Sequence, residues 1–141
     1  MNSKNLLIGT LVGGVAFFLL GYLLYGLLLE GYFMSNMGSA KGVMKANPNF
    51  PVLILGNLIG AFLLTYIFDH WAGIKTFLTG AKAGALIALL MALSFNLINF
   101  ATANVMTMNT AIVDGLVQMV MGAIAGGTIG WVLGNTKLTT T

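Results

Sequence analysis

The stretch "NTAIVDGLVQMVMGAIAGGTIGWVLG", residues 109–134, is long and apolar enough to cross a lipid bilayer as one helix. Two of its residues do not suit hydrocarbon, Asp114 and Gln118, which lie one helical turn apart. Small residues fill its second half, and glycine recurs at every fourth position: Gly122, Gly126, Gly130 and Gly134. Residues at this spacing share one face of a helix. The stretch therefore predicts a membrane helix with a polar beginning and a glycine ladder, as we call these four residues.

The whole chain has the composition of a membrane protein. Of its 141 residues 58% are hydrophobic and only 6% are charged. A soluble domain carries about 25% charged residues because it needs a wetted surface. The lysines form no basic run, which disfavours nucleic acid as a partner and leaves membrane lipid as the expected one. The chain has no cysteine, which excludes disulfides and thiolate metal sites.

Four apolar stretches are predicted to be transmembrane helices: about residues 6–29, 51–68, 76–103 and 109–134. Each comes close to or exceeds the roughly 18–20 residues that cross a hydrocarbon core about 30 Å thick. Helices are expected because lipid offers no partners to unpaired backbone groups, and the alternation of a barrel strand is absent. The first stretch is too long for a signal peptide and is expected to be retained. We therefore predict that residues 1–141 form one all-α domain, an integral membrane four-helix bundle.

The connections and the lysines predict an orientation. Residues 30–50 form the one longer loop, between the first two helices, and residues 69–75 form a tight turn. The lysines divide unequally between the two sides, with Lys4, Lys75, Lys82 and Lys137 on the side of the termini against Lys41 and Lys45 on the other. By the positive-inside rule, both termini are expected inside and the longer loop outside.

Polar side chains from all four predicted helices fall at a similar depth, in the outer half of the membrane. The members of this polar layer are Tyr22, Tyr25, Asn57, Asn96, Asn99, Asp114 and Gln118. An aspartate at the bilayer centre costs about 2.5–3.5 kcal/mol, and less near the interface. Asp114 is therefore expected to face the bundle and to hydrogen-bond to amides or tyrosines of this layer, unless it is protonated.

Three interpretations of the polar layer remain open. In the first interpretation, its members form interhelical hydrogen bonds that hold the bundle, each worth about 0.6 kcal/mol. Alternatively, they line a pocket that opens outward and binds a small molecule, an ion or a lipid. In the third interpretation Asp114 simply reaches the outer interface.

Pairs of glycines four residues apart also occur in the first three helices: Gly9 and Gly13, Gly56 and Gly60, Gly80 and Gly84. Such spacing lets helix backbones approach closely. The glycine ladder therefore predicts a close contact, either inside a tight bundle or as the seam between copies of the chain.

No catalytic, metal or cofactor site is predicted. The one histidine, His70, falls in the inner turn, on the opposite side from Asp114. The sequence contains no metalloprotease, phosphate-loop or dinucleotide-binding motif. We therefore expect a protein that is not an enzyme.

Three segments resemble a known family: "GYLLYGLLLEGYFMSNMG" (21–38), "KGVMKANPNFPVLILGNLIGAFLLTYIF" (41–68) and "DGLVQMVMGAIAGGTIGWVLG" (114–134). They are similar to an uncharacterised bacterial family of small four-helix integral membrane proteins, a DUF1761-like domain of unknown function. The resemblance implies four spans and a multi-pass protein of the bacterial inner membrane. It implies no activity and no catalytic residue.

Two functions are expected from these patterns. The first is a non-enzymatic membrane protein that acts by helix association, as an accessory or scaffold subunit of a larger complex or as a homo-oligomer, with the glycine ladder as its seam. The alternative is a binder or transporter of a small molecule, ion or lipid that uses the polar layer.

Overall fold

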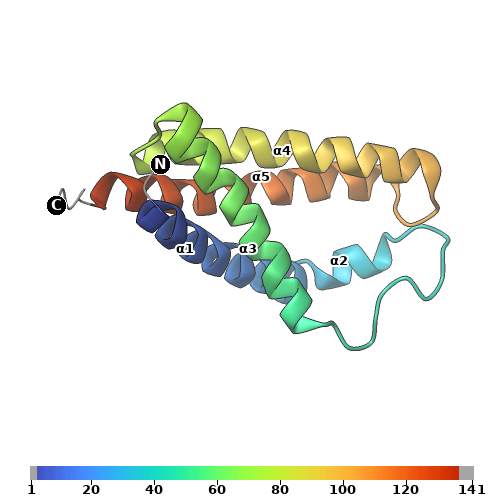
Figure 1. Ribbon diagram of the computed structural model, residues 1–141. Helices are drawn as coiled ribbons and strands as arrows, with labels where there is room; N and C mark the ends of the chain where they lie inside the picture. Colours follow the sequence, from blue (N-terminus) through green and yellow to red (C-terminus); the bar gives the residue numbers. More distant parts are fainter. Residues whose placement is uncertain (1–2, 137–141) are drawn as a thin grey trace.

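The computed structural model describes residues 3–136, and within that range it is all-helical apart from its connections (Figure 1). The elements in chain order are α1 (Ser3–Gly21), the π-helix η1 (Tyr22–Leu28), α2 (Glu30–Ser35), α3 (Phe50–Tyr66), the π-helix η2 (Ile67–Ala72), α4 (Phe77–Thr102) and α5 (Met108–Asn135). Lys137, which entered the predicted orientation, lies outside the described residues.

Four helices are long and apolar enough to cross a membrane: Ser3–Leu28, Phe50–Ala72, Phe77–Thr102 and Met108–Asn135. The predicted all-α, four-span fold class is thereby confirmed. Two bounds differ from the prediction. The second span continues as η2 to Ala72, so the turn that follows it is shorter than residues 69–75. The longer loop, residues 30–50, begins with the short helix α2.

Side-chain caps explain where three of the spans begin. The side chains of Asn49, Thr76 and Thr107 each accept a hydrogen bond from a backbone N–H in the first turn of α3, α4 and α5. Such a cap satisfies a donor that has no partner within its own helix. The three connections therefore end at defined residues, and the helices start directly after them.

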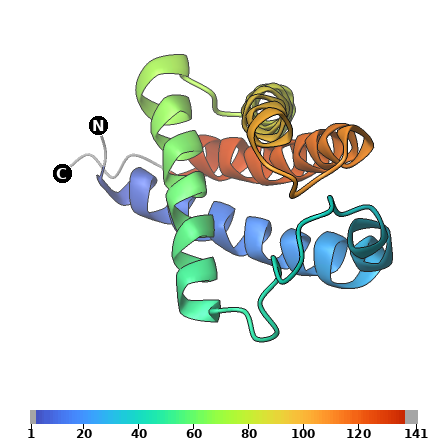
Figure 2. The same cartoon turned by 90° about the vertical axis from the view of Figure 1, so that its right-hand side faces the viewer.

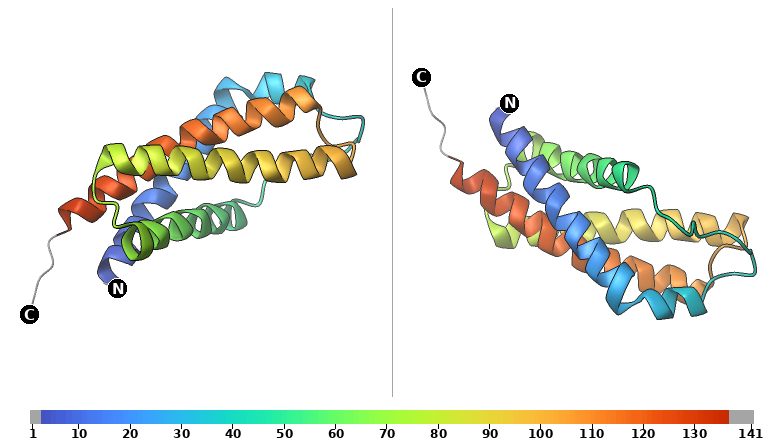
Figure 3. Two further views of the ribbon diagram at one scale, coloured as in Figure 1. Left: turned by 90° about the horizontal axis from the view of Figure 1, so that it is seen from above. Right: turned by 90° about the horizontal axis from the view of Figure 1, so that it is seen from below.

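The helices form an uneven bundle. α4 and α5 are antiparallel and pack along each other, while α1 packs against both α3 and α5. In Figure 2, α3 crosses α1 and α5 at a steep angle. Both described chain ends and the turn between η2 and α4 lie at one end, and the loop after α2 lies at the other (Figures 1 and 3). An even number of spans places both chain ends on the same side of a membrane. Which side that is stays a prediction.

The glycine ladder packs against α4 of the same chain. A methyl group at Gly126 would lie 2.6 Å from the carbonyl oxygen of Gly80 and 2.9 Å from the Cα of Gly84. One at Gly130 would lie 2.5 Å from the carbonyl oxygen of Thr76. Backbone therefore touches backbone along this contact, as small residues allow in membrane helices. The sequence left open a seam between copies, but α4 already covers this face.

The apolar core lies toward the end that holds the termini. Its buried residues are Leu64 and Phe68 from the second span and Ile129 and Leu133 from α5. Only the second half of the second span takes part in it. In the first half, Val52 is 61% exposed, so this half of α3 stands away from α4 and α5.

The two connections at the other end are joined to each other. The backbone N–H of Ala40 donates to the carbonyl oxygen of Asn104 at 2.9 Å, and Met37 and Met106 form an isolated antiparallel bridge. The Thr110 hydroxyl donates to the carbonyl oxygen of Asn36 at 2.6 Å. These contacts hold the end of the η1–α2 segment against the α4–α5 hairpin.

Candidate functional site

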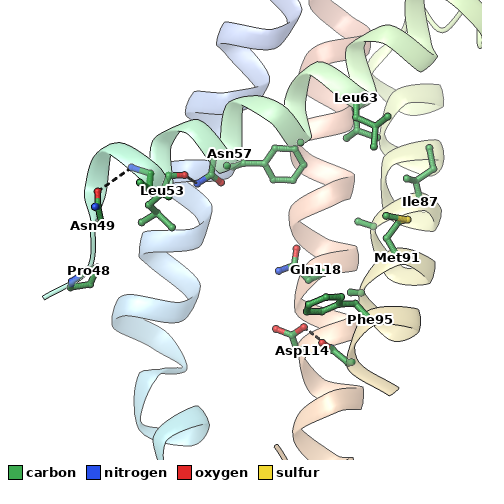
Figure 4. Close-up of a pocket in the computed structure, with 18 of the residues that line it drawn as sticks. Pro48, Asn49, Leu53, Asn57, Leu63, Ile87, Met91, Phe95, Asp114 and Gln118 are labelled. Atoms are coloured by element: carbon green, nitrogen blue, oxygen red, sulfur yellow. Dashed lines mark hydrogen bonds between the residues drawn. The ribbon is translucent and has the colours of Figure 1, made fainter. Parts of the chain in front are cut away.

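A groove of about 780 Å³ lies where the first half of α3 stands away from α4 and α5 (Figure 4). Apolar side chains form most of its walls, among them Leu53 and Leu63 of α3 and Ile87, Met91 and Phe95 of α4. In Figure 4, Met91 points from α4 toward α3. The groove lies between α3 and α4, and Phe95 on its wall is 68% exposed.

Polar side chains gather at the end of the groove nearer the α2–α3 loop. Asn57 of α3, Asn96 of α4 and Asp114 and Gln118 of α5 all line it there. Figure 4 shows Asp114 and Gln118 on one side of α5, a turn apart, and Leu63 near the opposite end of the groove. The groove is therefore amphipathic, with a polar end and a longer apolar end.

Four side chains from three spans form a connected hydrogen-bond network at the polar end. The Tyr25 hydroxyl donates to Oδ1 of Asp114 at 2.5 Å, and Nδ2 of Asn96 donates to Oδ2 of Asp114 at 2.6 Å. Nε2 of Gln118 donates to the Tyr25 hydroxyl oxygen at 3.0 Å. Asn96 also donates to the carbonyl oxygen of Ala111 at 3.1 Å. We call Tyr25, Asn96, Asp114 and Gln118 the Asp114 network.

The π-helix η1 positions the tyrosine of this network. In η1 the backbone N–H of Leu29 bonds to the carbonyl oxygen of Leu24, five residues earlier. Single π-turns within α-helices occur frequently at functional sites. The centroid of the Tyr25 ring also lies 5.1 Å from the ring centroid of Phe33, which follows in α2. Tyr25 is thus half-buried and directed at α5, whereas Tyr22 at the start of η1 is 58% exposed.

The carboxyl group of Asp114 has a hydrogen-bond partner at each oxygen, Tyr25 at one and Asn96 at the other. Neither partner carries a charged side chain. Lys75 and Asp69 form an ion pair at the other end of the bundle. The network therefore pairs both oxygens of Asp114 with neutral groups.

The structure brings together part of the polar layer predicted from the sequence. Tyr25, Asn96, Asp114 and Gln118 form the network, and Asn57 lines the same groove while donating to the carbonyl oxygen of Leu53. Tyr22 and Asn99 do not line the groove. Asn99 donates instead to the carbonyl oxygen of Phe95 in its own helix.

Sequence reasoning missed the two glycines on the α3 wall. Gly56 and Gly60 line the groove, and a methyl group at either would meet no atom within 4 Å. Their spacing is the same as that of Gly80 and Gly84, which pack tightly against α5. The sequence carries no signal that separates the two pairs, because the difference lies in the neighbouring helix.

The structure is thus all-helical in its described residues, with four helices long and apolar enough to cross a membrane and an amphipathic groove between α3 and α4. No family model, no curated protein sequence and no solved structure matches the chain. The resemblance noted in the sequence therefore stays a prediction.

Proposed function

We propose that this protein is a non-enzymatic, multi-pass protein of the bacterial inner membrane that binds a membrane lipid in the groove. The acyl chain would lie against the apolar wall of α3 and α4, and the headgroup would lie at the Asp114 network. One observation carries this proposal: a groove of about 780 Å³ between α3 and α4 joins an apolar wall to a polar end.

The depth of the network supports a lipid rather than a water-soluble ligand. Asp114 is 6 residues beyond Met108, where α5 begins, which is about 9 Å along the helix axis at about 1.5 Å per residue. The headgroup layer of a bilayer is about 5–8 Å thick on each side. A headgroup therefore reaches Asp114 by sinking only a few ångströms, and its chain then enters the apolar part of the groove.

Packing at the far end of the groove supports binding rather than transport. Leu64, Phe68 and Ile129 fill the bundle between the groove and the end that holds the termini. Because the glycine ladder contacts α4 of the same chain, it gives less support to association with another protein. Of the two functions expected from the sequence, lipid binding is therefore the one whose residues remain accessible to a partner.

The proposal is tested by filling the groove with side chains. Gly56→Leu combined with Gly60→Leu places two leucines in open space on the α3 wall. Gly31→Leu is the matched control, because Gly31 also meets no atom within 4 Å but does not line the groove. Each protein is purified in a mild detergent, and its retained lipid is counted by native mass spectrometry.

We expect the wild type and the Gly31 variant to retain lipid at a fixed stoichiometry. The double variant should lose about tenfold in occupancy under matched conditions, which corresponds to about 1.4 kcal/mol of binding free energy. Equal retention by all three proteins, with all three monodisperse, would show that lipid binds elsewhere and would overturn the proposal.

A further inference from the structure

The polar end of the groove presents several hydrogen-bond acceptors without partners together with an acid, and these groups specify the headgroup. We propose that the bound lipid carries a primary ammonium group that contacts Asp114, as in a phosphoethanolamine headgroup. This inference rests on the lipid binding proposed above and specifies its chemistry.

The orientation of each amide in the groove is fixed by its partners. Nδ2 of Asn57 donates to a carbonyl oxygen, and Nδ2 of Asn96 donates to a carbonyl oxygen and to a carboxylate. Gln118 must donate to the Tyr25 oxygen, because the hydroxyl hydrogen of Tyr25 is directed at Asp114. The amide oxygens are therefore left over, together with the second N–H of Asn57 and of Gln118.

Those three amide oxygens have no hydrogen-bond partner among residues 3–136, yet none is enclosed as a buried, unsatisfied atom. They belong to Asn57, Asn96 and Gln118, all of which line the groove. Asp114 adds further acceptor capacity, because its two oxygens carry more lone pairs than the two hydrogen bonds of the network use. An incoming headgroup therefore meets unpaired acceptors and the carboxyl group of Asp114, with two amide N–H donors beside them.

A primary ammonium group matches both features, since it carries a positive charge and three N–H donors, as the lysine side chain does. An anionic headgroup with hydroxyls can donate hydrogen bonds, but it brings no positive charge to Asp114. A quaternary ammonium would supply charge without any N–H donor. The geometry therefore favours the primary amine over its methylated relatives.

The rim of the groove agrees with a zwitterionic headgroup. Lys45 lines the groove from the α2–α3 loop and is exposed, so a lysine and an acid border the same cavity. A phosphate next to the ammonium group is attracted by Lys45, while Asp114 attracts the nitrogen. Of the common neutral headgroups, phosphoethanolamine carries both charges together with free N–H donors.

The test is a series of lipids that differ only in N-methylation. The delipidated protein is titrated with phosphatidylethanolamine, its N-monomethyl and N,N-dimethyl derivatives and phosphatidylcholine, all with the same acyl chains, and binding is read by native mass spectrometry. Phosphatidylglycerol is the anionic comparison, and free ethanolamine is the water-soluble one. The headgroup charge stays constant along the methylation series while the N–H donors fall from three to none.

We expect affinity to fall at each methylation, with phosphatidylcholine about tenfold or more weaker than phosphatidylethanolamine, or about 1.4 kcal/mol. Asp114→Asn should remove this preference while lipid still binds. Asp69→Asn is the matched control, because it removes an acid at the other end of the bundle and should keep the preference. The wild-type series needs no variant to fold and tests the inference directly.

The outcomes separate the two proposals. Equal binding of all headgroups that is still abolished by filling the groove at Gly56 and Gly60 would overturn the ammonium inference and keep lipid binding. Tight binding of free ethanolamine alone would overturn the choice of a lipid as the source of the amine. Binding that ignores both headgroup and groove would overturn both proposals.

Discussion

Tyr25 and Asp114 are 89 positions apart in the sequence, and their side chains are joined by a hydrogen bond of 2.5 Å. The bond connects the π-helix η1 to the first turns of α5, at the polar end of the groove. Because Asn96 of α4 holds the other oxygen of Asp114, one carboxyl group links three spans. Each of its contacts can be removed separately.

Tyr25→Phe removes the hydroxyl that donates to Asp114 and accepts from Gln118. We expect the free energy of unfolding to fall by about 0.6–1.7 kcal/mol, the range for hydrogen bonds between membrane helices. The measurement is reversible unfolding in bicelles or mixed micelles. Tyr22→Phe is the control and should have no effect, because Tyr22 is 58% exposed and outside the network. A double-mutant cycle with Asp114→Ala should give a coupling energy above zero, and strict additivity would contradict a direct interaction.

Gly126→Leu should destabilise the α4–α5 hairpin strongly. Its side chain would start 2.6 Å from the carbonyl oxygen of Gly80, and a backbone atom cannot turn aside as a flexible side chain does. Overpacking typically costs about 1–3 kcal/mol, and we expect about 3 kcal/mol or more here. Gly56→Leu is the matched control, because open space surrounds that glycine. Equal unfolding free energies for the two variants would contradict the packing described for the ladder.

Gly38→Ala should loosen the joined connections at the groove end of the bundle. The added methyl group would collide with the carbonyl oxygen of Asn104, which also accepts from the backbone N–H of Ala40. We expect faster hydrogen exchange at the Ala40 amide and a stability loss of about 1–2 kcal/mol. Gly31→Ala, at a glycine with no atom within 4 Å, should leave that exchange rate unchanged. Slow exchange at Ala40 in both variants would count against the contact.

Single cysteines test the predicted orientation, since the chain has none of its own. Ser39→Cys lies in the α2–α3 loop and Ala72→Cys lies at the end of η2, and both positions are exposed. With both termini inside, a membrane-impermeant maleimide should label Ser39→Cys in intact cells. It should label Ala72→Cys only after the membrane is permeabilised. The reverse pattern would contradict the orientation inferred from the lysines.

Composition alone was sufficient to predict the fold class, because a chain with 6% charged residues has too little charge for a soluble surface and only helices satisfy their own backbone in lipid. Polar residues at matching depth also anticipated much of the site. Asp114 and Asn96 do meet, since an acid in an apolar span needs partners at its own level. Tyr22 and Asn99 lie at that depth, but their side chains point in other directions around their helices. The prediction of a span gives the depth of a residue far better than the direction of its side chain.

The groove itself could not be predicted, because it results from the angle at which α3 leaves the bundle. Gly60 and Gly84 have the same local pattern, yet one borders open space and the other contacts α5. The π-turn that directs Tyr25 at α5 likewise has no distinct sequence signal. Both features depend on contacts between helices that are far apart in the chain.

The backbone contact between α4 and α5 has a consequence for how the protein enters the membrane. α5 has the lowest mean hydropathy of the four spans, 1.7 against 2.2 for the first. It also carries an acid, which costs about 2.5–3.5 kcal/mol at mid-bilayer and less at the depth of Asp114. α4, which carries Asn96 and the glycines that contact α5, is synthesised just before α5. We expect glycosylation mapping to show poor insertion of residues 108–135 alone and efficient insertion of residues 77–135. The last two spans would then leave the translocon as one preassembled hairpin, so that Asp114 reaches the lipid already hydrogen-bonded.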